Sequence, residues 1–265
     1  MGTVSYVLRR RDRPRSDPAK LAALRAVIRR IERRAPGGEA SVEAVSFGAT
    51  EIDAALPWGG LPRGALHEVL GDDGALYGFS ATLAARIADD KRPILWCRRG
   101  RDLYGPGLAA FGIDTDRLIL VQGAKDADIL WAMEEALRSG AVAAVLGEVA
   151  RANATATRRL QLAAERGGGT ALLLRPGKTT VPPCPAATRW RIVTAPTLDG
   201  VDGVTGPRWQ VDLMRCRNGM PRSWVVEMRH GSTGDFVVVT DLLHRPVTPE
   251  VGTKGNARSR LRLAG

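Results

Sequence analysis

Residues 59–78 carry the pattern that decides the fold of this chain. They read Gly59-Gly-Leu-Pro-Arg-Gly64, Ala65-Leu-His-Glu-Val-Leu70 and Gly71-Asp-Asp-Gly-Ala-Leu-Tyr-Gly78. The middle block is a short apolar run bounded by glycines, which is typical of a strand buried in a parallel sheet. The last block is rich in glycine and precedes a helical pattern near residues 79–89. A strand, a glycine-rich segment and a helix in this order predict a βα unit.

Strand and helix patterns alternate along the middle of the chain. Strands are expected near residues 66–70, 94–97, 118–121, 142–149 and 170–174, and helices near 79–89, 102–111, 127–139 and 154–165. This alternation predicts an α/β fold with a mainly parallel sheet and helices on both faces. Later strands, expected near 189–194, 209–217 and 224–229, alternate apolar and polar residues. The turn at residues 217–221 predicts that the last two are antiparallel.

The glycine-rich segment after the first strand differs from a phosphate-binding loop. Such a loop reads G-x-x-x-x-G-K-[ST], in which backbone N–H groups and the lysine hold phosphates and the hydroxyl holds magnesium. Counted from Gly71 and past Gly74, the last three positions are Leu76, Tyr77 and Gly78. Phosphoryl transfer depends on positioning and neutralising charge, so we expect no ATP turnover and no bound cofactor. A divergent nucleotide site that uses Arg98 or Arg99 is the alternative.

The ends of the chain are basic, whereas its body is nearly neutral. The net charge is +11; residues 1–36 hold eleven Lys or Arg against three acids, residues 253–265 hold four and no acid, and the remainder carries −1. Basic ends favour polyanions because phosphate contacts release counterions, although solvated arms are the alternative interpretation. The residues expected to contact DNA are Arg9, Arg10, Arg11, Arg13, Arg15, Lys254, Arg258, Arg260 and Arg262.

A helix is expected near the N-terminus. Asp17 followed by Pro18 is a favourable start, and Pro36 marks the end. The apolar stripe of this helix consists of Leu21, Leu24, Val27, Ile28 and Ile31. The stripe has to be buried on a partner protein or on the chain's own body. We therefore expect a basic flexible arm at 1–16, an amphipathic helix at 17–36, a globular domain at 40–245 and a basic disordered tail at 246–265.

The composition excludes several classes of protein. Hydrophobic residues make up 44% and charged residues 25% of the 265, as in a soluble globular protein. No apolar run approaches the roughly 18 residues that span a bilayer, and no cleavable leader is visible, so we expect a cytoplasmic protein. Three separated cysteines and three histidines predict neither disulfides nor a metal site. Six tryptophans are expected in the core: Trp58, Trp96, Trp131, Trp190, Trp209 and Trp224.

The order of several motifs resembles that of RecA-type recombinases. Residues 42–64 resemble the approach to the ATPase core of that family, and further resemblances follow at 111–118, 138–142 and 216–221. Where that family has its catalytic glutamate, this chain reads Arg98-Arg-Gly-Arg101, and Gly147-Glu148 stands where the magnesium-linked aspartate belongs. A RecA-like body without these groups is similar to the ImuA family, RecA-like accessory proteins of bacterial mutagenic translesion synthesis.

The resemblance to the ImuA family implies a non-catalytic adaptor that acts in DNA repair and is induced by DNA damage in the SOS response. It implies an ImuB-like Y-family polymerase homologue and an error-prone replicative polymerase paralogue as partners. In RecA-type filaments a short N-terminal segment docks on the neighbouring protomer. We therefore expect helix 17–36 to contact ImuB, RecA or a second copy of this chain. The alternatives are a RecA-paralogue, DNA-binding recombination factor and a SulA-type cell-division inhibitor.

The segment at residues 175–185 falls where RecA-type recombinases have a mobile DNA-contacting loop. Here it contains four prolines, and its charged residues are Arg175 and Lys178. Proline restricts the backbone, and two charges are few for DNA pairing. We therefore expect no recombinase-type DNA pairing by this loop, and we expect any DNA contact to be made by the basic ends.

Overall fold

The computed structural model describes residues 43–100, 103–177, 182–196, 206–228 and 236–242. The arm, the amphipathic helix and the tail expected at 1–16, 17–36 and 246–265 lie outside these residues, and so do all their expected contact residues. The expected limits of the domain, 40 and 245, also fall outside them.

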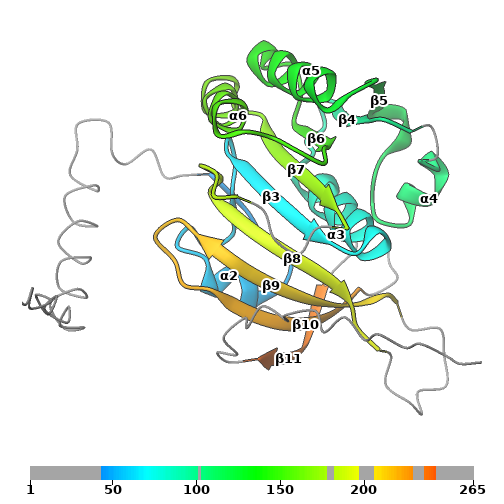
Figure 1. The fold of residues 1–265 in the computed structure, drawn as a ribbon. Coiled ribbons are helices and arrows are strands. Elements are labelled where there is room, and N and C mark those ends of the chain that lie inside the picture. The colour runs from blue at the N-terminus through cyan, green and yellow to red at the C-terminus, as the bar shows by residue number, and fades with distance from the viewer. Residues whose placement is uncertain (1–42, 101–102, 178–181, 197–205, 229–235, 243–265) are drawn as a thin grey trace, which may run out of the picture. The chain divides into compact units, whose positions relative to one another are not determined.

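A nine-stranded sheet forms the centre of the body, in the order β11-β10-β9-β8-β3-β7-β6-β4-β5 (Figure 1). Its strands are β3 (Leu66–Gly71), β4 (Ile94–Arg98), β5 (Leu118–Gln122), β6 (Ala144–Glu148), β7 (Thr170–Pro176), β8 (Thr188–Thr194), β9 (Arg208–Cys216), β10 (Arg222–Met228) and β11 (Phe236–Leu242). Neighbours from β8 to β5 are parallel, and β8 to β11 are antiparallel. The predicted mainly parallel sheet with late antiparallel strands is therefore confirmed.

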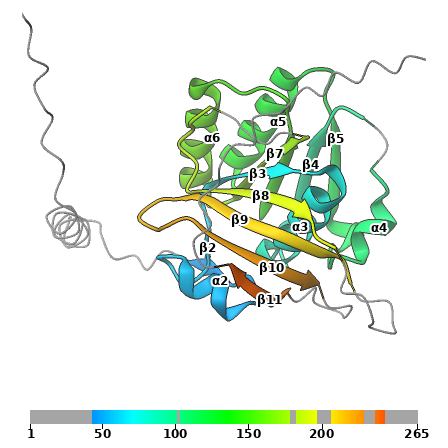
Figure 2. The ribbon, with the colours of Figure 1, turned by 60° about the horizontal axis from the view of Figure 1, so that its bottom comes forward.

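Helices cover both faces of the sheet (Figure 2). On one face lies α3 (Asp73–Ile87), which contacts β8, β3 and β7; on the other lie α5 (Asp126–Ser139) and α6 (Ala154–Gly167), packed against each other. The shorter elements are β1 (Ala44–Val45), α2 (Thr50–Ala55), β2 (Leu61–Pro62), α4 (Gly105–Ala109) and the 3-10 helix η1 (Thr115–Arg117). Strands β3, β4, β6 and β7 bury both faces, which explains their nearly continuous apolar sequences.

Two apolar cores follow from this layering. The α3 face buries a cluster of aromatic rings in which Phe79 lies 6.2 Å from Trp190 and 5.5 Å from Phe236, centroid to centroid. The α5 and α6 face is aliphatic and contains Ile129, Met133 and Leu160 among other residues. Burying one such side chain fully contributes about 1.5–3 kcal/mol. None of the helices in the described residues is long and apolar enough to cross a membrane.

Some elements differ from the sequence predictions. Helix α3 begins at Asp73, earlier than the expected 79, and α4 covers 105–109 of the expected 102–111, where Gly105 and Gly107 disfavour a longer helix. Strand β11 and the short β1–β2 pair were not predicted. The glycine run after α6 ends that helix as expected, because Gly168 adopts a left-handed conformation with a φ of 71°.

The prediction that all six tryptophans lie in the core is wrong for one of them. Trp96, Trp190, Trp209 and Trp224 are buried, and Trp58 is partly buried against the same core. Trp131 is 63% exposed on the outer side of α5. The helical spacing explains this, because Ile129 and Met133 point toward the sheet and the residue midway between them points away.

Candidate functional site

The carboxyl ends of β3, β4, β6 and β7 meet at one edge of the sheet, since these strands are parallel. In α/β proteins this edge is where ligands usually bind. Helix α6 begins at the same edge with Asn153, whose side chain accepts a hydrogen bond from the Ala156 N–H. Residues contributed by β3, α3, β4 and β6 therefore define the candidate site.

The connection from β3 to α3 is a single residue, Asp72, because β3 ends at Gly71 and α3 begins at Asp73. Gly71 has a φ of 138°, and a Cβ there would lie 1.7 Å from the carbonyl oxygen of Ile192. The Asp72 N–H donates to that same carbonyl at 3.1 Å. A residue with a side chain cannot replace Gly71 without moving β8. The close approach of Gly71 and Asp72 to β8 lets the chain pass from strand to helix over a single residue.

Of the five loop positions considered in the sequence, Gly71 ends β3 and the other four lie inside a helix. Gly74, Leu76, Tyr77 and Gly78 all belong to α3. The Leu76 N–H donates to the carbonyl of Asp72 at 2.7 Å, so it is used by the helix. A phosphate-binding loop instead turns successive N–H groups toward one anion.

Two carboxylates stand at the N-terminus of α3. Asp72 is the N-cap residue and Asp73 lies in the first turn. The Asp72 Oδ2 accepts a hydrogen bond from the Thr194 N–H at 3.2 Å, which ties the start of the helix to β8. Acidic groups at this end are stabilised by the helix dipole. They also repel another anion that approaches the same end.

The side chain of Glu148, at the end of β6, joins residues of α3 and β4. Its Oε2 accepts a hydrogen bond from the Tyr77 hydroxyl at 3.1 Å, and its Oε1 accepts one from Trp96 Nε1 at 2.8 Å. The Arg98 Nε lies 3.3 Å from Oε1, and the Arg98 guanidinium carbon lies 5.8 Å from the centre of the Tyr77 ring. We call Tyr77, Trp96, Arg98 and Glu148 the carboxylate network.

Burial and charge keep Tyr77 neutral. Burial raises the pKa of the Tyr77 hydroxyl far above its usual range, and the neighbouring Glu148 carboxylate raises it further. The hydroxyl is therefore a hydrogen-bond donor at every physiological pH. Glu148 and Arg98 are both about nine-tenths buried, so their attraction is screened little by water. Among the described residues, no group of three or more His, Cys, Asp or Glu side chains is placed to hold a metal ion.

Sequence reasoning found most of the carboxylate network but missed one member. Tyr77, Arg98 and Glu148 were singled out separately, and the fold brings all three together. Trp96 was interpreted as a core aromatic, which its complete burial confirms, but its indole N–H also holds the carboxylate. A buried tryptophan generally needs an acceptor for its N–H. The position of Trp96 two residues before Arg98, on the same face of the strand, was the signal that could have placed it near the same carboxylate.

Arg175, at the start of the segment 175–185, is buried. It is 3% exposed, and its Nε lies 3.0 Å from Oε1 of the buried Glu68. Its charge is therefore used within the core. Arg99, the other arginine considered for a nucleotide, pairs with Asp126 at 3.6 Å.

The fold defines the class of this protein as RecA-like α/β. A KaiC-like protein of the archaeon Pyrococcus horikoshii superimposes on 75% of the chain, and on all of its own length, with a TM-score of 0.52 and 17% identity. SulA from Pseudomonas aeruginosa matches 42% of the chain with a TM-score of 0.38, which is too low to establish a shared fold. No model of a known protein family matches the chain.

Sequence relatives identify the family. The protein ImuA of Caulobacter vibrioides is 36% identical over 231 residues, which cover 79% of this chain and 95% of that protein. RecA proteins of Clostridium novyi and Chlorobium limicola are each 30% identical, over 135 and 144 residues, and the match covers 38% and 40% of their lengths. The chain belongs to the ImuA family.

Proposed function

We propose that this chain is a RecA-like adaptor of a mutagenic translesion synthesis complex that acts after DNA damage in the cytoplasm. Membership of the ImuA family and the similarity to RecA proteins support a role after DNA damage. The hydrogen bond from Tyr77 to Glu148 is the observation that supports a non-catalytic role. A carboxylate that binds magnesium, directly or through water, needs its oxygens directed at the ion. The two oxygens of Glu148 instead accept hydrogen bonds from Tyr77 and Trp96.

The carboxylate network supports this proposal energetically. Both oxygens of Glu148 already accept donors from the chain itself, and Arg98 is drawn toward the same carboxylate. A nucleotide would have to displace these buried contacts without a phosphate-binding lysine to compensate. Asp72 and Asp73 add negative charge where a triphosphate would approach. We therefore expect nucleotide binding at this edge of the sheet to be unfavourable.

An adaptor needs surfaces that bind partners, and β5 is one of them in this proposal. It pairs with β4 along one side, and its other side is the edge of the sheet in the described residues. Its sequence Leu118-Ile-Leu-Val-Gln122 has no charge and no proline, and Ile119 and Leu120 are 46% and 50% exposed. Exposed edge strands are normally protected by charges or proline.

We propose that the free edge of β5 receives an extended segment of a partner as an added strand. The backbone supplies the hydrogen bonds, and the two apolar side chains supply the specific contacts. The expected partners are the ImuB-like polymerase homologue, which would bring in the error-prone polymerase, and RecA or a second copy of this chain. The N-terminal helix at residues 17–36 stays a second proposed contact.

Nucleotide binding is the direct test of the non-catalytic role. The full chain is titrated with a fluorescent ATP analogue in the presence of magnesium, with a RecA protein as the positive control. We expect no saturable signal from this chain under conditions that saturate RecA. Saturable binding that requires magnesium would contradict the proposal.

The mutagenic role is tested in cells. A strain that lacks the gene is irradiated with ultraviolet light, and resistant mutants, survivors and cell lengths are measured. We expect induced mutation to collapse while survival falls only slightly. An unchanged frequency of induced mutants with poor survival would favour the RecA-paralogue recombination factor. The similarity to RecA proteins is the observation that supports this alternative. Altered cell length on overexpression would favour a division inhibitor.

A further inference from the structure

A cluster of arginines lies over the connection between β7 and β8. Residues 182–187 of this connection are described and lead into β8. Arg189 donates to one carbonyl of the connection at 2.7 Å, Arg215 donates to two at 2.8 and 2.9 Å, and Arg217 donates to one at 3.1 Å. The accepting carbonyls belong to Pro182, Cys184, Ala186 and Pro185, respectively.

These contacts fix the guanidinium groups without neutralising them. A carbonyl oxygen is a neutral acceptor, so Arg215 and Arg217 keep their full charge. Both are exposed, and within the described residues neither forms a salt bridge with a carboxylate. Beneath them, the buried Glu68 is shared by Arg175 and Arg189, at 3.0 and 2.8 Å. Two guanidinium groups therefore share one carboxylate, and among the described residues the charges of Arg215 and Arg217 are not paired with it.

The strand register places two of these charges face to face. Arg189 of β8 lies opposite Arg215 of β9, and like charges in such a pair destabilise a sheet. The arrangement holds because Glu68 and the backbone carbonyls fix both side chains. Residues whose placement lowers the stability of a sheet in this way often belong to functional sites. An anion bound between them would remove the repulsion.

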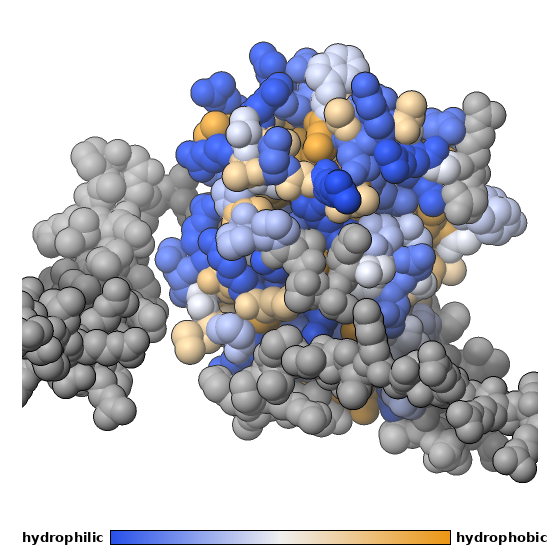
Figure 3. All heavy atoms as spheres, viewed as in Figure 1, coloured by the Kyte–Doolittle hydropathy of each residue, from blue (hydrophilic) through white to orange (hydrophobic). Residues whose placement is uncertain are grey.

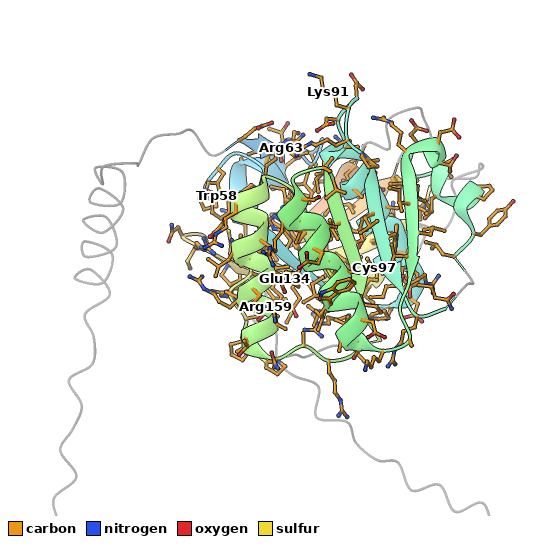
Figure 4. The ribbon with its side chains drawn as sticks, turned by 90° about the horizontal axis from the view of Figure 1, so that it is seen from above. Trp58, Arg63, Lys91, Cys97, Glu134 and Arg159 are labelled. Atoms are coloured by element: carbon orange, nitrogen blue, oxygen red, sulfur yellow. The ribbon has the colours of Figure 1, made fainter. Side chains whose placement is uncertain are left out.

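The arginine cluster lies at the edge of the sheet opposite the carboxylate network. Thr188 begins β8 and pairs with Cys216 near the end of β9, so Arg217 lies at the amino ends of the parallel strands. In Figure 4 this amino-end edge is marked by Arg63, just before β3, and by Lys91, just before β4. Arg159 of α6 lies on the opposite side of the body in that view. Figure 3 shows that the face with α5, α6 and β8 is largely hydrophilic.

We propose that Arg215 and Arg217, held in place by the carbonyls of residues 184–186, bind the phosphate backbone of nucleic acid. Guanidinium groups that are already positioned lose little freedom on binding and match phosphate oxygens in geometry. Backbone contacts need charge and hydrogen-bond donors but no apolar pocket, as at this surface. The site is independent of the proposed adaptor role and of the basic ends.

Salt-dependent DNA binding tests the proposal. Binding of a fluorescein-labelled oligothymidylate to the full chain is followed by anisotropy at increasing salt, for the parent and for Arg215→Gln with Arg217→Gln. Loss of two phosphate contacts should lower the slope of log K against log salt by about 1.4 for single-stranded DNA. The matched control, Arg151→Gln with Arg158→Gln, removes the same charge from exposed positions away from this edge and should leave the slope near the parent value.

A second variant separates charge from loop structure. Arg215→Lys with Arg217→Lys keeps the charge but loses the paired carbonyl contacts, so it should keep most of the slope. The proposal is overturned if the glutamine pair and the control pair lower the slope equally, or if neither lowers it. It is also overturned if the parent chain binds poly-glutamate as tightly as the oligothymidylate, because the surface would then fit an acidic protein.

Discussion

The hydroxyl of Tyr77 donates to Oε2 of Glu148 at 3.1 Å, although 71 residues separate them in sequence. Tyr77 stands where a phosphate-binding loop has its lysine, and Glu148 ends the strand where a magnesium-linked acid belongs. The two positions that would serve a nucleotide therefore bind each other. Trp96 and Arg98 of β4 complete the contact, so the carboxylate is held from two further positions.

Tyr77→Phe is predicted to destabilise the fold by about 1 kcal/mol, because a partly buried hydrogen bond to a carboxylate is lost while the ring is kept. Chemical denaturation of the parent and the variant measures this difference. Tyr104→Phe is the matched control, since that ring is 71% exposed on the surface and should be neutral. A variant as stable as the parent would show that the hydroxyl contributes nothing.

Glu148→Gln is predicted to cost more, about 3 kcal/mol, because it leaves the buried Arg98 without its carboxylate. The melting temperature and the denaturation midpoint should both fall. Glu135→Gln on α5 removes an exposed carboxylate that pairs with Arg138 and should change stability by less than about 0.5 kcal/mol. Equal effects of the two substitutions would contradict a structural role of the network.

The stability of the fold should fall in mild acid because of His67. Burial lowers the pKa of His67 from 6.5 to about 4. Its Nδ1 accepts from the Thr188 hydroxyl at 2.7 Å and its Nε2 donates to the Pro62 carbonyl at 3.0 Å, an arrangement that uses the neutral ring. The unfolded chain binds a proton near pH 6.5 and the folded chain near pH 4, so stability is lost as pH falls through this window.

The loss from His67 should reach about 3 kcal/mol when the pH falls from 7 to 4. It is measured as the difference in unfolding free energy between the parent and His67→Gln across that range. The glutamine variant does not titrate there, so its own decline reports the remaining groups. Parallel curves for the two proteins would exclude His67 as the cause.

Leu120→Lys is predicted to weaken partner binding at least tenfold without unfolding the protein. The charge is placed on the free edge of β5, where lysine opposes strand addition, while the side chain stays in solvent. Binding to purified ImuB, to RecA and to the chain itself is measured for both proteins. Val239→Lys is the control, because Val239 is 39% exposed on β11 at the opposite edge. Unchanged binding to all three partners would refute the β5 proposal.

Local patterns predicted the elements whose residues are buried on both faces. The strands near 66–70, 94–97 and 170–174 are apolar throughout, and the structure has them within one or two residues. The start of α3 could not be predicted in this way. Its first residues, Asp73 and Gly74, favour a turn locally, and the contacts of Asp72 and Gly71 with β8 make them helical.

The same limit applies to the individual side chains. Trp131 and Trp96 are both aromatic residues within regular elements, yet one is exposed and the other is fully buried. Arg175 has the sequence context of a surface loop, and it is buried because β3 places Glu68 beside it. Position in a layer decides these cases, and a layer is built from segments far apart in sequence.

Residue patterns within single segments predict the layered α/β architecture and the antiparallel strands at the end of the sheet, and they show Tyr77 where a phosphate loop has its lysine. These properties depend on residue type and on spacing within one segment, which are local. The tertiary structure alone decided that Tyr77, Trp96, Arg98 and Glu148 meet, and that Arg189 and Arg215 face each other. Parallel strand order and strand register bring these residues together, and both are set by packing between segments distant in sequence.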